Sequence, residues 1–154
     1  MADLRSALTS AGLTNVATYI QSGNIAAEWA SGDDALAQLV EEVLVESFDV
    51  EVRAIVVAQA KIASVLDGSP FAVDANPAYQ VIYFANAPVD VNEVNAIDPS
   101  KYPGDTITAS PTVVYVSYEH GQSKSKLTLN ALERAAGCDL TGRNLRSTTK
   151  LLNL

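Results

Sequence analysis

The chain turns at Tyr19-Ile20-Gln21-Ser22-Gly23-Asn24-Ile25, where two apolar runs meet at a Ser-Gly step. The runs on either side, residues 16–21 and 24–29, have the composition of β-strands. A two-residue connection suits a hairpin because its glycine adopts a positive φ without steric cost. The stretch therefore predicts a β-hairpin, around which the other helices and strands are arranged.

Polar side chains crowd this turn. Gln21, Ser22 and Asn24 place amide and hydroxyl groups around a glycine whose backbone can be approached closely. They could line a small pocket for an anion or a carbonyl group. They could equally bond to local backbone groups and do no more than shape the turn.

Hydrophobic periodicity supplies the other elements. The helices that we expect span residues 2–11, 33–47, 58–66, 89–96, 123–136 and 148–152. The further strands that we expect span residues 50–57, 79–84, 106–109 and 113–118, and residues 140–146 are extended or turn-like. This order predicts a single α+β unit over residues 1–154, with two halves at about 1–57 and 58–154.

Each half has the element order of a ferredoxin-like β-α-β-β-α-β unit, but the first half begins at its helix and lacks the N-terminal strand. That strand is interior in such a unit, so its absence would expose apolar edges. We therefore expect either that the chain is a fragment or a mis-started product, or that a homodimer or another partner covers the gap.

Composition limits the functional classes. The net charge of −8 disfavours nucleic acid and anionic membranes, because phosphates would be repelled at long range. No apolar run reaches the roughly 20 residues of a membrane helix. A single cysteine and the lack of a signal-peptide pattern favour the cytoplasm. Neither a metal site nor a cofactor is expected, since His120 and Cys138 are too few and too far apart to form a ligand cluster.

The charge is unevenly distributed. Residues 120–154 contain six basic and two acidic residues, a net charge of +4, whereas residues 1–119 carry −12. Lys124 and Lys126 follow Gly121 at the start of an expected helix, where backbone N–H groups attract anions. This segment predicts either a phosphate or carboxylate site, or a helix capped by Ser123 with exposed lysines.

A third polar segment lies near the C-terminus. Arg143 offers a fork of donors that suits a carboxylate or a phosphate, and Asn144 can hold a turn. Arg143 could instead form an ion pair within the chain. His120, the one histidine, is better interpreted as a loop residue than as the base of a hydrolase, because no nucleophile motif accompanies it.

Three runs of sequence carry a family resemblance. They are Tyr19-Ile20-Gln21-Ser22-Gly23-Asn24, then Ser123-Lys124-Ser125-Lys126-Leu127, and last Thr141-Gly142-Arg143-Asn144-Leu145. With these runs in this order, the sequence resembles the family catalogued as domain of unknown function 1697. The resemblance implies an α+β fold with two ferredoxin-like halves and implies no established activity. Two departures are the missing opening strand with its Arg-Gly turn, and Leu145 in place of a usual tryptophan.

The leading hypothesis is a cytoplasmic domain that binds a small anionic molecule, such as a nucleotide or another phosphate. Its site would be lined by Gln21, Ser22, Asn24, Lys124, Lys126, Arg143 and Asn144. The first alternative is a structural or protein-interaction module in which these polar motifs only fix the fold. A second alternative is an enzyme of unknown reaction, for which the sequence offers no set of acid, base and nucleophile.

Overall fold

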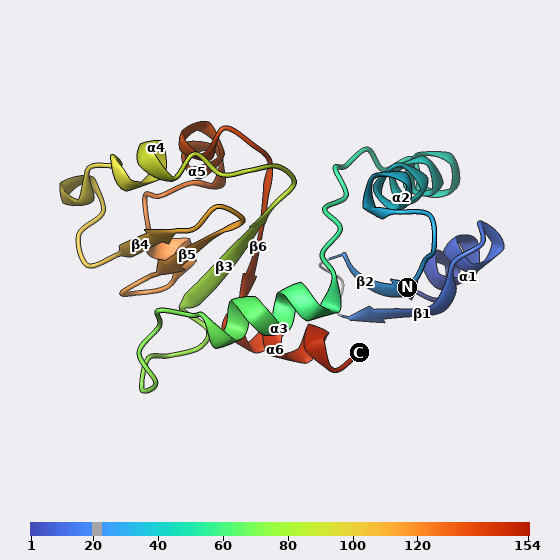
Figure 1. The fold of residues 1–154 in the computed structure, drawn as a ribbon, viewed down its shortest axis with the longest axis horizontal. Helices are drawn as coiled ribbons and strands as arrows, with labels where there is room; N and C mark the ends of the chain where they lie inside the picture. The colour runs from blue at the N-terminus through green and yellow to red at the C-terminus, as the bar shows by residue number, and fades with distance from the viewer. Residues whose placement is uncertain (20–22) are drawn as a thin grey trace. The chain divides into compact units, whose positions relative to one another are not determined.

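The computed structural model describes residues 1–19 and 23–154 and divides the chain into two compact units. Unit 1 consists of Met1–Ala58 with Leu151–Leu154, and unit 2 is Gln59–Lys150. Both units combine helices with a small antiparallel sheet, so the predicted α+β class is confirmed (Figure 1). No described helix has the length and apolar composition that a membrane crossing requires.

Unit 1 contains two helices and the hairpin. The elements are α1 (Ala2–Ser10), β1 (Thr14–Tyr19), β2 (Asn24–Glu28) and α2 (Asp33–Phe48). The strands β1 and β2 pair antiparallel, with Tyr19 opposite Asn24 beside the turn. The hairpin predicted from the Ser-Gly step is thus confirmed in its described strands. Leu8 of α1 and Val40 and Val43 of α2 are buried in the core of this unit because each helix has one apolar face.

One predicted strand of unit 1 is wrong. Residues 50–57 have the alternating, β-branched pattern of a strand, yet they form no β-ladder with any described residue. β-propensity reflects a fit to a pleated, half-buried surface, and it forms no strand where no neighbouring strand is available for pairing.

Unit 2 has the element order β-α-β-β-α-β, preceded and followed by a helix. Its elements are α3 (Gln59–Asp67), β3 (Gln80–Ala85), α4 (Val91–Asn95), η1 (Pro99–Lys101), β4 (Thr106–Ala109), β5 (Val113–Ser117), η2 (Gln122–Lys124), α5 (Leu129–Ala136), β6 (Leu140–Asn144) and α6 (Leu145–Leu152), whose last two residues belong to unit 1. The sheet order is β4-β5-β3-β6, with all neighbours antiparallel. The predicted hairpin of residues 106–109 and 113–118 is confirmed as β4 and β5. The extended run predicted over 140–146 is confirmed for Leu140–Asn144 as β6, whereas residues 145 and 146 begin α6.

The two faces of this sheet are covered by different helices (Figure 1). Alternate residues of β3, such as Val81 and Tyr83, pack with Val94 of α4 and Leu132 of α5. The intervening residues face the opposite side, where the Tyr115 hydroxyl donates to the Val65 carbonyl of α3 at 2.8 Å. β3 is buried along most of its length because it is interior in the sheet and covered on both faces.

The predicted helix of residues 123–136 begins later than expected, and this is a correction. The 3₁₀ turn η2 ends at Lys124, Ser125 is extended, and α5 starts at Leu129. Thr128 caps α5, since its hydroxyl accepts a hydrogen bond from the Ala131 amide at 3.1 Å. Ser123 is therefore not the helix cap, and the two lysines do not lie at a helix N-terminus.

Candidate functional site

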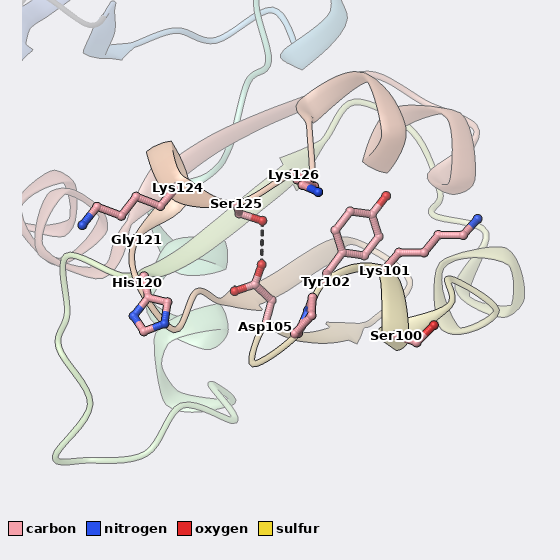
Figure 2. Close-up of a pocket in the computed structure, with 10 residues that line it drawn as sticks. Ser100, Lys101, Tyr102, Asp105, His120, Gly121, Lys124, Ser125 and Lys126 are labelled. Atoms are coloured by element: carbon pink, nitrogen blue, oxygen red, sulfur yellow. Dashed lines mark hydrogen bonds between the residues drawn. The ribbon is translucent and has the colours of Figure 1, made fainter.

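A groove in unit 2 is lined by basic side chains from two segments that are distant in sequence, and in Figure 2 the side chains of Lys101 and Lys124 extend in opposite directions. One wall comes from η1 and the loop that leads to β4, and the other comes from the chain between β5 and α5. Its volume is about 620 Å³, within the range of small-molecule pockets. We call it the lysine groove, and its lining residues are Ser100, Lys101, Tyr102, Pro103, Asp105, His120, Gly121, Lys124, Ser125 and Lys126.

Asp105 joins the two walls. Its Oδ2 accepts a hydrogen bond from the Ser125 hydroxyl at 2.6 Å, and its Oδ1 accepts one from the Glu119 amide at 3.1 Å. The Ser125 Oγ in turn accepts from the Leu127 amide at 3.0 Å. Figure 2 shows the bond between Ser125 and Asp105 as a dashed line. Because these bonds commit the Asp105 carboxylate to the loop, they fix the backbone that carries Lys124 and Lys126.

A second set of hydrogen bonds ties this loop to the core. The Gln122 Nε2 donates to the Tyr83 hydroxyl at 3.0 Å, and the Tyr83 and Tyr118 hydroxyls lie 2.6 Å apart. Both tyrosines are 1% exposed. Burial raises the pKa of both phenols above the ordinary value, so each remains a neutral hydroxyl at physiological pH. The loop therefore begins at a fixed point on the sheet.

The turn η1 holds the opposite wall. Asp98 caps it, since its Oδ1 accepts from the Ser100 amide at 2.9 Å and from the Ser100 hydroxyl at 2.7 Å. These bonds lower the pKa of Asp98. Tyr102 follows the turn and packs partly against the core of unit 2. The cap thus determines where Lys101 and Tyr102 enter the groove.

The lining of the groove is positively charged. It contains three lysines and one aspartate, in a chain whose net charge is −8. Within the described residues none of these lysines forms an ion pair with a carboxylate. His120, at the rim, lies beside Glu119, with 3.6 Å between Nε2 and Oε2. The ammonium groups are thus available for an anion from solvent.

The structure places the residues of the predicted site in different parts of the chain. Gln21 and Ser22 lie outside the described residues. Asn24 is 5% exposed, and its Nδ2 donates to the Tyr19 carbonyl at 3.1 Å. This local bond joins the end of β1 to the start of β2. This contact agrees with the interpretation in which the polar residues shape the turn. Lys124 and Lys126 both line the lysine groove.

Arg143 and Asn144 lie on β6 and are not among the lining residues of that groove. The Arg143 Nη1 donates to the Thr141 hydroxyl and to the Gly142 carbonyl, each at 2.8 Å. Burial lowers the pKa of Arg143. The Asn144 Oδ1 accepts from the Ser147 amide at 2.9 Å and so holds the first turn of α6. A single site of all seven residues stays a prediction.

Comparison with known proteins now assigns the family. The model of the family described as "Protein of unknown function (DUF1697)" matches residues 1–115. The chain belongs to this family. Among solved structures it is similar to the conserved bacterial protein SP0830 from Streptococcus pneumoniae, with 21% identity and a TM-score of 0.71 over 99% of this chain and 87% of that one. At that identity the likeness shows the fold alone. The curated proteins contain no match.

The DUF1697 match includes the hairpin motif and one wall of the lysine groove, and it ends before the motifs at residues 123–127 and 141–145. Of the residues that line the groove, Lys124 and Lys126 were predicted from the sequence as site residues, whereas Lys101, Tyr102 and Asp105 were not. Asp98-Pro99 was a local signal for a capped turn there. No local pattern indicates that this turn lies opposite residues 120–126, because β4 and β5 separate them along the chain.

The surroundings of the remaining candidate residues, Cys138 and the possible metal ligands, do not indicate a reactive site. Cys138 is half-buried against the core of unit 2. Burial raises the pKa of its thiol, which disfavours the reactive thiolate. No three His, Cys, Asp or Glu side chains of the described residues are grouped as metal ligands.

Proposed function

We propose that unit 2 binds a small anionic molecule, with a phosphate or carboxylate group, in the lysine groove. The observation that carries this proposal is that Lys101, Lys124 and Lys126 line one groove and that none of them forms an ion pair with a carboxylate of the described residues. A lysine ammonium binds phosphate as a compact charge with three donors. Three such groups would offset the long-range repulsion that the acidic chain exerts on an anion.

The hydrogen bonds behind the groove strengthen the proposal. Asp105 holds Ser125, and Gln122 holds the loop to Tyr83, so two lysines are carried on a backbone already fixed before a ligand arrives. A fixed site loses less conformational entropy on binding than a mobile loop would. The lysine side chains themselves are exposed, so we expect affinity to fall as ionic strength rises.

Thermal unfolding with added ligand tests the proposal. Pyrophosphate, a nucleoside monophosphate and citrate are titrated separately at low ionic strength. A ligand present at about 100 times its dissociation constant stabilises the native state by about 2.7 kcal/mol. The Lys124→Ala/Lys126→Ala variant should bind at least tenfold more weakly, while Lys150→Ala, on α6 and outside the groove lining, should bind like the wild type. Equal responses of the two variants, or no response to any anion, would refute the proposal.

The alternative is a structural or protein-interaction module. Asn24 and Asn144 favour it, since each bonds nearby backbone and so supports its own turn. Under this alternative the lysine variants unfold like the wild type in every anion. For either function we retain the cytoplasmic location that the single cysteine favours.

A further inference from the structure

The lysine groove differs in chemistry from one end to the other. In Figure 2, Lys124 lies at one end, and Tyr102 and Lys101 lie at the other. The hydrogen bond between Ser125 and Asp105 lies between the two ends in this view. A molecule that fills the groove therefore meets a cation, then a carboxylate, then an aromatic ring.

The Asp105 carboxylate determines which part of a ligand suits the middle of the groove. Its oxygens accept hydrogen bonds from the Ser125 hydroxyl at 2.6 Å and from the Glu119 amide at 3.1 Å. Each carboxylate oxygen has two acceptor sites, so each can accept one more hydrogen bond. A second anion placed here would be repelled, whereas a hydroxyl group would donate to Asp105. The middle of the groove therefore suits a neutral part of the ligand that carries hydroxyl groups, such as a sugar.

The Tyr102 ring supplies a flat apolar surface at one end. This side chain is half-buried, packs partly against the core of unit 2 and also lines the groove. A nucleobase of any type can stack on such a ring, because every base has a π-face. Lys101 and Lys126 line the same end of the groove in the view of Figure 2. Their ammonium groups can donate to the ring nitrogens and carbonyl oxygens of a base.

We propose that the anion bound in the lysine groove is a nucleoside 5′-monophosphate, an inference that rests on the function proposed above. The phosphate meets Lys124, the ribose hydroxyls donate to Asp105, and the base stacks on Tyr102. The order of phosphate, sugar and base in the nucleotide thus matches the order of cation, carboxylate and aromatic ring in the groove. A sugar phosphate or a tricarboxylate carries the charge but leaves the Tyr102 ring in water.

The test compares adenosine 5′-monophosphate with ribose 5-phosphate, which carries the same phosphate and lacks the base. Both are titrated into the full chain at low ionic strength by isothermal titration calorimetry. The nucleotide should bind at least about tenfold more tightly, because stacking on an aromatic side chain adds to the phosphate contacts. Equal affinities would overturn this inference and leave the anion site in place. Binding of neither ligand would refute the anion site as well.

Two variants of Tyr102 separate stacking from charge. Tyr102→Phe retains the ring and should preserve the preference for the nucleotide, whereas Tyr102→Leu removes the ring and should reduce that preference to less than about threefold. Circular dichroism verifies that both variants fold. The same preference in Tyr102→Leu as in the wild type would overturn the inference.

A measurement on the wild type needs no variant. In saturation-transfer difference NMR with adenosine 5′-monophosphate, the adenine protons H2 and H8 should receive more saturation than the ribose protons, because the base packs on the Tyr102 ring. Stronger saturation of the ribose protons would contradict a stacked base.

Discussion

The pair of buried phenols offers the sharpest prediction for the stability of unit 2. The Tyr83 and Tyr118 hydroxyls lie 2.6 Å apart, and each tyrosine is 1% exposed. Tyr83→Phe removes one hydroxyl and leaves the Tyr118 hydroxyl buried without that partner. Tyr118→Phe creates the converse defect, although Tyr83 keeps its bond from Gln122. Each defect is local, because no large side chain is removed.

The magnitude follows from desolvation. A buried polar group that loses its hydrogen-bond partner costs about 1–3 kcal/mol. We expect Tyr83→Phe to fall at the upper part of this range and Tyr118→Phe at the lower part, because Gln122 still satisfies Tyr83 in the second variant. The double variant has no orphaned hydroxyl in this pair, so it should lose about 1–2 kcal/mol less than the sum of the two single losses.

The measurement is a double-mutant cycle by urea unfolding. Five of the six tyrosines lie in unit 2, and Trp29 lies in unit 1, so tyrosine near-UV circular dichroism reports mainly on unit 2 and tryptophan fluorescence on unit 1. Tyr102→Phe is the matched control, since its hydroxyl has no hydrogen bond in the described structure, and it should change stability by less than about 0.5 kcal/mol. Losses that add to within about 0.5 kcal/mol would show that the two phenols are not coupled and would refute the hydrogen-bond chain.

Three further predictions concern the same unit. Gly142→Ala should destabilise unit 2 by about 1–3 kcal/mol, because the added methyl would lie 2.6 Å from Cε1 of the buried Tyr83 ring. Gly68→Ala is the control: the nearest contact of its added methyl would be at 3.4 Å, so it should show no such loss of stability in urea unfolding. Alkaline pH should destabilise the protein above about pH 10, by up to about 1.4 kcal/mol per pH unit for each buried phenol. The reason is that the raised pKa keeps the native phenols protonated while the unfolded ones ionise, and a double Phe variant should show a shallower decline. Asp105→Ala should cost about 1–3 kcal/mol, since two donors lose a charged acceptor, whereas the exposed Asp74→Ala should be neutral by the same assay.

Local sequence patterns were sufficient to predict most of the helices and strands. The hairpin strands, α1, α2 and β3 to β6 follow from periodicity and turn residues, because in each case the tertiary neighbours agree with the local preference. Residues 50–57 show the opposite case: their strand preference is strong, and no neighbouring strand is present among the described residues to satisfy it. The predicted helix at Ser123 was wrong because Ser125 bonds Asp105 and Leu127, which holds the chain extended until Thr128 caps α5.

The candidate site was predictable only in part. The basic side chains of Lys124 and Lys126 were visible as a local excess of charge. Their partners in the groove were not, since Lys101 and Tyr102 are brought to them by the β4–β5 hairpin. Such a convergence depends on sheet register, and a single sequence carries no direct signal for it.

Anion binding in the lysine groove is tested most directly by a titration of the ¹⁵N-labelled protein with pyrophosphate, followed by two-dimensional NMR at low ionic strength. We predict saturable shifts that are largest for the amides of residues 100–105 and 120–126, and that are lost in Lys124→Ala/Lys126→Ala but kept in Lys150→Ala. Shifts that scatter over the surface without saturating, or that persist unchanged in the double variant, would contradict an anion site in the groove.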